Sequence, residues 1–308
     1  MAMGIEARAA AGERAASRAR NAASRLRAWL AWGNLRRLPL PHLVVIGLFV
    51  VFSVFGEYLA PLPFNQQDLR ARFTPPMWLD GGNPMYPLGT DNLGRDILSR
   101  MIVGVRASFI VTVAALAFGS VLGSLIGLAS GYFGGRFDAV VMRTADGMMA
   151  FPLILAALLL VAVIGPGIHT VVIAASLILW ARFARLIRSE VLSVRERDYV
   201  TLARVAGASS RRIMLVHILP NVLNSVVVLL TLQLGFVIIV EATLSFLGAG
   251  VPPPTPTWGQ MVASGRTYID TAWWMSLFPG LAIAVVVLSF NLLGDWLRDH
   301  LDPRLRQL

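Results

Sequence analysis

The stretch RVAGASSRRIMLVHILPN (204–221) decides how the rest of the sequence folds. It contains Arg204, Arg211 and Arg212 together with a glycine and a proline, yet long apolar runs lie on both sides of it. Apolar runs of about 20 residues can cross a bilayer as helices, whereas arginines are costly inside one. The stretch therefore predicts a surface segment that connects two membrane-spanning helices.

The composition favours a membrane protein over a soluble one. Of 308 residues, 56% are hydrophobic and only 14% are charged, and the mean hydropathy is +0.67. A soluble domain has about 25% charged residues. The net charge of +10 comes from arginine, because the chain has no lysine. The placement of these arginines favours a membrane protein and not one that binds nucleic acid. The absence of cysteine excludes disulfides, thiolate metal sites and cysteine nucleophiles.

Six apolar stretches are long enough to predict an all-α membrane protein with six transmembrane helices. A turn at Gly165-Pro166-Gly167 separates the third from the fourth. The predicted spans are 42–60, 105–131, 151–168, 170–188, 222–247 and 277–297.

Arginines in the short loops predict the orientation, because cytoplasmic loops are enriched in them. The loops 61–104 and 249–275 carry five arginines and balance them with aspartates. The loop 189–221 with the helix end before it carries eight: Arg182, Arg185, Arg188, Arg195, Arg197, Arg204, Arg211 and Arg212. Residues 1–41, 132–150, 189–221 and the tail after 297 are therefore predicted to be cytoplasmic, with both termini inside. The loops 61–104 and 249–275 are predicted outside, and each is called an outer loop below.

The N-terminal arm 1–41 is basic, with eight arginines in residues 1–40. Its length and the near-spanning run after it favour a retained first span over a cleaved signal peptide. Residues 6–37 fit a basic amphipathic helix on the membrane surface. A disordered arm fits equally well. The six-helix membrane domain is therefore predicted to start at residue 42 and to extend to residue 308.

The loop 189–221 predicts two short helices that meet at Gly207, a residue that tolerates a left-handed turn. The first helix is expected from Glu190 to Ala206, and Ser209 or Ser210 can cap the second. Pro220 either ends the second helix or lies in the first turn of the next span. From these residues alone, an amphipathic connector and a docking element are both possible.

The outer loops and the spans hold a few further candidates. Asp91, Arg95 and Asp96 lack the ligand spacing of a calcium loop, so a helix cap at Thr90 or Asp91 is preferred. Trp258 is a candidate for contact with an external partner. Trp273 and Trp274 fit anchors at the membrane interface.

Glu241 lies toward the outer end of the fifth predicted span. An ionisable residue inside the membrane suggests function. Near the end of a span it can instead reach the interface or pair with a neighbour. The histidines are scattered and form no zinc motif, so no metal site is predicted. The chain also lacks a Walker A sequence for binding ATP.

Residues 199–221, YVTLARVAGASSRRIMLVHILPN, resemble the cytoplasmic EAA loop of ABC-importer permease subunits. Ala203, Gly207 and the Leu219-Pro220 pair lie at the spacing of that motif. The chain departs from it at Thr201 and Leu202, where the family usually has Glu and Ala. Loss of that glutamate affects any ion pair the residue makes in the family. Many relatives have Ile where this chain has His217, although the peptide-importer branch often has His.

Further segments resemble the C-type permease subunit of oligopeptide, dipeptide and nickel importers, and the resemblance covers about 39–308. They are PLGTDNLGRDILSRMIVGVRASF (87–109), GYFGGRFDAVVMR (131–143), LSFLGAG (244–250), PTWGQMV (256–262) and FPGLAIAVVVLSFNLLGDWLRDHLDPR (278–304). The resemblance implies the transmembrane fold of a type I ABC importer in a bacterial inner membrane.

In that family the EAA loop forms a coupling helix that fits a groove on the ATPase subunit. The resemblance implies that the following residues lie at or near this interface: Ala203, Arg204, Gly207, Ala208, Ser209, Arg211, Arg212, His217 and Pro220. It also implies a second homologous permease subunit, two ATP-binding subunits and a periplasmic or lipoprotein solute-binding protein. ATP and Mg²⁺ would bind to the ATPases, and no cofactor to this chain.

The resemblance favours import of di- or oligopeptides, with nickel or glutathione as alternatives. An ion-coupled secondary transporter would have ionisable groups near the midplane, often in inverted repeats. No convincing repeat is found, and no motif of an intramembrane enzyme is present. The EAA loop separates the first class from the second, because it has no role without an ATPase.

Overall fold

The computed structural model describes residues 39–301, which are almost entirely helical. The N-terminal arm 1–41, with the expected helix 6–37, lies outside these residues except at 39–41. The elements of the first half are α3 (Leu40–Leu59), η1 (Leu69–Ala71), α4 (Ile97–Phe133), α5 (Gly135–Ala150) and α6 (Leu153–Ile164). Those of the second half are α7 (Ile168–Arg195), α8 (Asp198–Val205), α9 (Ser210–Arg212), the π-helical segment η2 (Ile213–Ile218), α10 (Leu219–Phe246), α11 (Trp258–Arg266) and α12 (Trp274–Leu301).

Five helices in the described part of the chain are long and apolar enough to cross a membrane. They are α3, α4, α7, α10 with the preceding α9 and η2, and α12. They correspond to five of the six predicted spans. The predicted turn at residues 165–167 is confirmed, because α6 ends at Ile164 and α7 begins at Ile168.

The third predicted span, 151–168, is wrong as one continuous helix. Its helix α6 has 12 residues, or about 18 Å, whereas the apolar core of a bilayer is about 30 Å thick. The preceding α5 meets α6 at an angle of 90°. Phe151 adopts an extended conformation at this bend, as expected for a residue that precedes a proline. A sixth span exists only if the bent pair α5–α6 counts as one.

The segment 132–150, predicted as a loop, contains the whole of helix α5. Ion pairs join α5 to α7: Arg188 donates two hydrogen bonds to Asp138, at 2.6 and 3.0 Å, and Arg185 pairs with Asp146. Near the end of α5, the Trp180 ring N–H lies 3.1 Å from the Met148 sulfur. The low hydropathy of this segment predicted a loop because it contains charges whose partners lie about 40 to 50 residues later.

A row of glycines on α4 allows α7 to approach its backbone closely. Gly119, Gly123, Gly127 and Gly131 recur every four residues, so they lie on one face of the helix. A Cβ at Gly127 would lie 2.9 Å from the Ala184 Cα atom, and a Cβ at Gly131 would lie 2.8 Å from the Val191 Cβ atom. Small residues at such positions are a common basis of helix packing in membranes.

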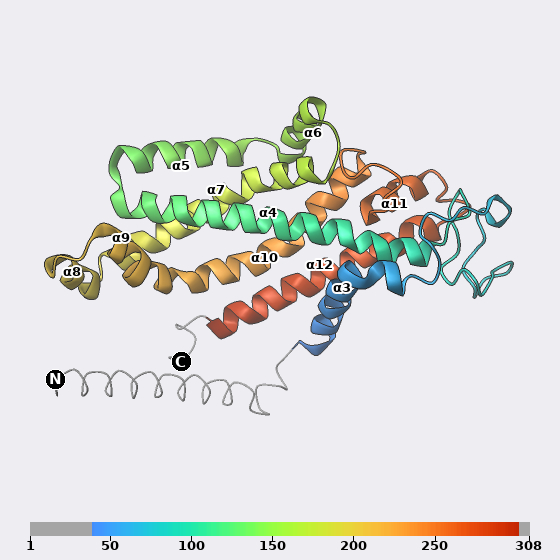
Figure 1. The fold of residues 1–308 in the computed structure, drawn as a ribbon, viewed down its shortest axis with the longest axis horizontal. Coiled ribbons are helices and arrows are strands. Elements are labelled where there is room, and N and C mark those ends of the chain that lie inside the picture. Colours follow the sequence, from blue (N-terminus) through green and yellow to red (C-terminus); the bar gives the residue numbers. More distant parts are fainter. Residues whose placement is uncertain (1–38, 302–308) are drawn as a thin grey trace, which may run out of the picture. The chain divides into compact units, whose positions relative to one another are not determined.

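The helices α4, α7 and α10 lie side by side, with a shared core between them (Figure 1). A second core joins α3, α11 and α12 through aromatic rings. The Phe49 ring meets those of Trp258 and Phe290 at centroid distances of 6.0 and 5.8 Å. In Figure 1, α8 lies at one end of this helical unit, and the outer loop before α4 lies at the other.

Replacing Gly127 with leucine should destabilise the α4–α7 pair, because the new side chain would overlap the backbone of α7 at Ala184. Overpacking of this kind costs about 1–3 kcal/mol or more. The matched control is Gly47→Leu in α3, where a Cβ meets nothing within 4 Å. We expect a lower melting temperature in detergent for the first variant and little change for the second. Equal melting temperatures would contradict the packing role.

Candidate functional site

The segment 198–221 folds as a turn of two helical pieces at one end of the helical unit (Figure 1). The first piece, α8, begins at Asp198, not at Glu190 as predicted, because Glu190 still belongs to α7. Gly207 follows α8 with a φ of 77°, in the left-handed region expected for it. Ser209 then caps α9 by accepting a hydrogen bond from the Arg212 amide.

The second piece does not end at Pro220. It runs from α9 through the π-helical segment η2 into α10, where Pro220 lies in the first turn. This is the second of the two roles predicted for Pro220. The Asn221 side chain donates a hydrogen bond of 2.7 Å to the carbonyl oxygen of His217. The surface segment is therefore continuous with a membrane-spanning helix.

Buried side chains fasten this segment to the main core. Val200 of α8 and Ile213 and Ile218 of η2 are almost completely buried in the core that includes α4, α7 and α10. Ala203 and Ala208 pack against the same core. The backbone closes the turn as well, since the Ala208 N–H donates to the Ala203 carbonyl at 3.0 Å. The segment is thus packed on the ends of the spans.

The outer face of the segment combines apolar groups with arginines. Leu202 is 66% exposed and Val205 is 81% exposed, although both lie on a short helix outside the spans. Arg204, Arg211 and Arg212 are exposed and make no ion pair with any described carboxylate. Such a surface, apolar with a positive rim, is suited to binding another protein.

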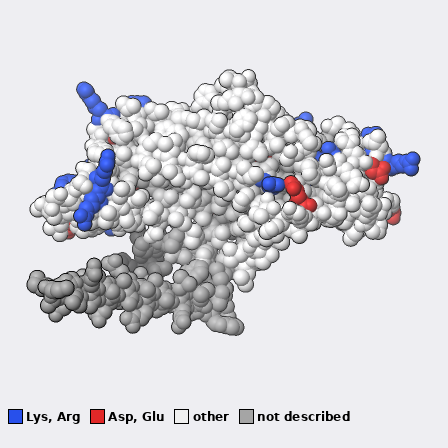
Figure 2. All heavy atoms as spheres, in the orientation of Figure 1, with Lys and Arg blue, Asp and Glu red and all other residues white. Residues whose placement is uncertain are grey.

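In the view of Figure 2, charged side chains gather at two ends of the helical unit. Basic groups predominate at the end that carries α8 and α9, whereas acidic and basic groups mix at the opposite end. The surface between them is uncharged except for one adjoining basic and acidic group. This distribution is that of a membrane protein whose uncharged zone lies between two polar surfaces.

Residues 119–307 match the model of the family described as the binding-protein-dependent transport system inner membrane component. The chain belongs to this family. It is therefore a multi-pass inner-membrane subunit of a transport system and not an enzyme. Membership also implies assembly with other components of an ABC transport system.

Three curated relatives are similar over most of their length. The di/tripeptide transport system permease protein DppC of Pseudomonas aeruginosa is 43% identical over 267 residues, which cover 87% of this chain and 88% of the relative. The dipeptide permease protein DppC of Haemophilus influenzae is 41% identical and that of Escherichia coli 44%, covering 86% of this chain in each case and 90% and 87% of the relatives.

Among solved structures, an inward-facing conformation of the MetNI methionine ABC transporter resembles this chain with a TM-score of 0.51. The match covers 67% of this chain and 98% of the other, at 16% identity. At this identity the likeness shows the fold alone. It confirms the predicted transmembrane fold of a type I ABC importer.

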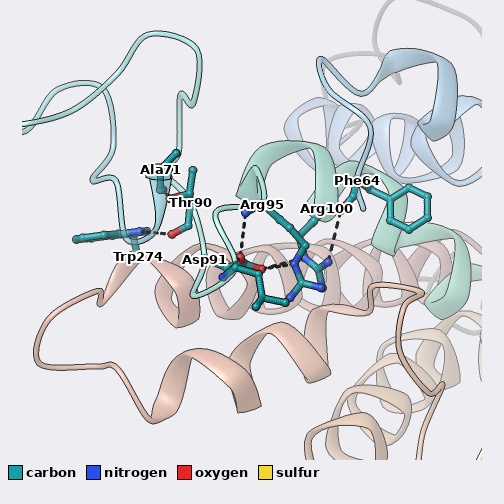
Figure 3. Close-up of polar contacts among 8 residues, drawn as sticks. Phe64, Ala71, Thr90, Asp91, Arg95, Arg100 and Trp274 are labelled. Carbon is teal, nitrogen blue, oxygen red and sulfur yellow. Dashed lines mark hydrogen bonds and ion pairs between the residues drawn. The ribbon is translucent and has the colours of Figure 1, made fainter. Parts of the chain in front are cut away.

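The first outer loop contains a buried ionic cluster (Figure 3). Arg95 donates to the Asp91 carboxylate at 2.7 Å, and the Arg100 Nε lies 3.7 Å from the same oxygen. The other Asp91 oxygen accepts from the backbone amides of Leu93 and Arg95 at 2.8 and 3.0 Å. Asp91 and Arg100 are only 6% and 5% exposed. The cluster stabilises the loop, and the Asp91 carboxylate is occupied by these donors.

The predicted helix cap at Thr90 or Asp91 is wrong. Asp96 caps α4, and its carboxylate accepts from the Ser99 amide at 2.8 Å and the Ser99 hydroxyl at 2.5 Å. Burial raises the pKa of Asp96, although these hydrogen bonds oppose the effect. Thr90 instead accepts a bond from the Trp274 ring N–H at 3.1 Å, which joins the loop to α12 (Figure 3).

Trp258 and Trp274 are not exposed, contrary to the predicted roles in partner contact and interfacial anchoring. Trp258 is 4% exposed and donates to the Met101 carbonyl at 2.9 Å, so it fixes α11 against α4. Trp274 is 5% exposed. A tryptophan in a loop predicts an interface only when nothing covers it, and here the loop and α4 cover both rings.

Glu241 is completely buried between α10 and α4. Its carboxylate accepts hydrogen bonds from the hydroxyls of Ser108, at 2.5 Å, and Ser245, at 2.7 Å. Of the two alternatives from the sequence, this is pairing with neighbours inside the protein. Ser108 lies 133 residues earlier, so the sequence could not identify this partner. No group of three or more His, Cys, Asp or Glu with metal-site geometry occurs among the described residues.

Asp91→Asn should destabilise the outer loop, because it keeps the amide contacts but leaves Arg95 and Arg100 as buried cations without an anion. Breaking a buried ion pair costs about 3 kcal/mol or more. The matched control is Glu57→Gln, since Glu57 pairs with Arg106 where both side chains are more than half exposed. That change should cost about 1 kcal/mol or less.

Melting of the purified complex, together with limited proteolysis of residues 61–96, measures both variants. Equal losses of stability in the two variants would show that the buried Asp91 cluster stabilises the protein no more than the exposed pair of Glu57 and Arg106 does.

Proposed function

We propose that this chain is the permease subunit of an ATP-driven importer of di- or oligopeptides. The named function of the curated relatives supports the peptide class, since DppC proteins of three bacteria are more than 40% identical to it. Residues 42–308 would form the permease domain and residues 1–41 a basic cytoplasmic arm. The segment 198–221 and both termini would face the cytoplasm.

Several partners follow from this proposal. A second, homologous permease subunit would complete the path, and two ATP-binding subunits would supply the energy. A periplasmic or lipoprotein solute-binding protein would deliver the peptide to the outer side. ATP and Mg²⁺ would be bound by the ATPases, with no cofactor on this chain. Lipid would surround the apolar faces.

One observation carries the coupling role: segment 198–221 presents exposed apolar and basic groups on a base that is buried. Leu202 and Val205 offer the apolar contact, and the arginines offer attraction to acidic groups on the ATPase. Val200 and Ile218 connect the segment to the spans. A force on this surface would therefore move α7 and α10 as rigid bodies.

Gly207 tests the shape of the coupling segment. Its φ of 77° is strained for any residue with a β-branch, but open space surrounds the position. Gly207→Val should therefore alter the turn through backbone strain of about 1–2 kcal/mol. Asparagine tolerates this region, so Gly207→Asn serves as the control. We expect peptide-stimulated ATPase activity and uptake to fall severalfold in the first variant and remain near wild type in the second.

The complete complex in proteoliposomes, with its binding protein and a dipeptide, is the system for this measurement. Equal activities of the two variants would remove Gly207 from the coupling role. Failure of the wild-type complex to transport any peptide would contradict the peptide function itself.

Leu202 tests the docking surface. Leu202→Glu should weaken binding of the ATPase by about tenfold, because it places a charge in an apolar contact. Thr201→Glu adds the same charge one residue earlier, where the related motif has glutamate, and should preserve binding. Copurification of the ATPase subunits and its dependence on salt measure the effect. If both variants bind equally well, the exposed apolar face of α8 is not the contact.

A further inference from the structure

Arg182 lies midway along α7, about 20 Å from either end of the helix. Its Nη1 lies 3.4 Å from the side-chain oxygen of Gln233 on α10, and its guanidinium covers the Phe236 ring at 4.1 Å. No described carboxylate lies within ion-pair distance of it. The next arginines on α7 differ, because Arg185 pairs with Asp146 and Arg188 with Asp138.

The side-chain amide of Gln233 adds a second hydrogen-bond donor beside Arg182. Gln233 is 7% exposed, and its amide nitrogen has no hydrogen-bond partner among the described residues. The orientation of the amide is determined by Arg182, since a guanidinium only donates and must face the amide oxygen. The pair therefore presents only donors: the remaining guanidinium N–H groups and the amide NH₂. Such a set is complementary to a carboxylate.

The surroundings of Arg182 favour protein or water over lipid. The side chain is only partly buried by the described residues, and it lies within the predicted span 170–188, six residues before its cytoplasmic end. A cation inside a span almost always faces the interior of the assembly or a water-filled cavity. The Phe236 ring and the Gln233 oxygen stabilise it without an anion. A permanently paired arginine would not need this support.

We propose that Arg182 and Gln233 form a carboxylate-binding site on the translocation path, which receives the C-terminal carboxylate of the peptide. This inference rests on the proposed peptide function. The site would attract the carboxylate end and repel the ammonium end, so it would orient the peptide. One cation and one amide hold the carboxylate with fewer donors than a fully enclosed site would, so they permit its release as well as its binding.

The experiment compares a tripeptide with its C-terminal amide, using the whole complex in proteoliposomes with the binding protein. For each variant, the uptake of the tripeptide with a free carboxylate is divided by the uptake of its C-terminal amide. This acid-to-amide ratio is then divided by the same ratio for the wild-type complex. This normalisation removes the preference of the binding protein. Arg182→Gln should lower the ratio by about tenfold, the size expected for one charge-assisted contact. Arg182→Lys keeps the charge and should stay within about threefold of wild type.

Two further variants separate binding from folding. Gln233→Glu gives Arg182 an internal carboxylate, so the protein should assemble normally while the ratio falls as in Arg182→Gln. Arg185→Gln, one turn farther along α7, should leave the ratio within about twofold. Copurification of all subunits confirms assembly for each variant.

A second measurement does not use the tripeptide amide. It labels single cysteines introduced into the chain, which has no cysteine of its own. Phe236→Cys should react with a charged, membrane-impermeant thiol reagent, and excess tripeptide should protect it. Val121→Cys on α4 is the control, because Val121 is 60% exposed on an apolar span, where a thiol does not ionise. Mass spectrometry of this subunit measures the labelling of both cysteine variants.

An unchanged ratio in Arg182→Gln, or no labelling of Phe236→Cys, would overturn the site while leaving the peptide function intact. Loss of assembly in both Arg182→Gln and Gln233→Glu would also overturn it, in favour of a contact between Arg182 and a carboxylate of another subunit. A wild-type complex that imports no tripeptide would refute the peptide function first.

Discussion

The structure depends on the close approach of α4 and α7 along the glycines of α4. Without side chains at Gly119, Gly123, Gly127 and Gly131, the two backbones come within contact distance over three turns. Dispersion and tight packing then supply the attraction that water cannot supply inside a bilayer. Because α7 leads directly to α8, this contact also determines where the segment 198–221 sits.

Several carboxylates have structural partners within the described chain. Asp91, Asp138 and Glu241 each have donors within hydrogen-bond distance, and the first two face arginines. These groups hold loops and helices together. The arginines of segment 198–221 and Arg182 have no anion among the described residues. An ion pair of the exposed arginines of segment 198–221, or of the partly buried Arg182, would therefore need an anion from outside the described residues.

The sequence predicted what depends on local pattern. Apolar length identified five spans, and Gly207 identified the turn after α8. The cap of α9 was predicted at Ser209 or Ser210, and the structure places it at Ser209. Contacts between distant segments were not predictable: Asp96 rather than Asp91 caps α4, because Arg95 and Arg100 occupy the Asp91 carboxylate. The burial of Trp258 also depends on distant neighbours. The four-residue spacing of the glycines is visible in the sequence, but their role in packing follows only from the position of α7.

The coupling segment and the Arg182–Gln233 pair involve the same two helices. The segment joins the end of α7 to the start of α10, and the pair bridges the middle of these helices by a single long hydrogen bond of 3.4 Å. The contacts of α7 with α4 are far more extensive along the glycines, so α7 and α4 should move together, whereas α10 is tied to α7 by weaker contacts midway along the two helices. Under the proposed function, ATPase closure would therefore change the separation of the two donors before it disturbs the α4–α7 contact, and a bound carboxylate would lose one of its two partners.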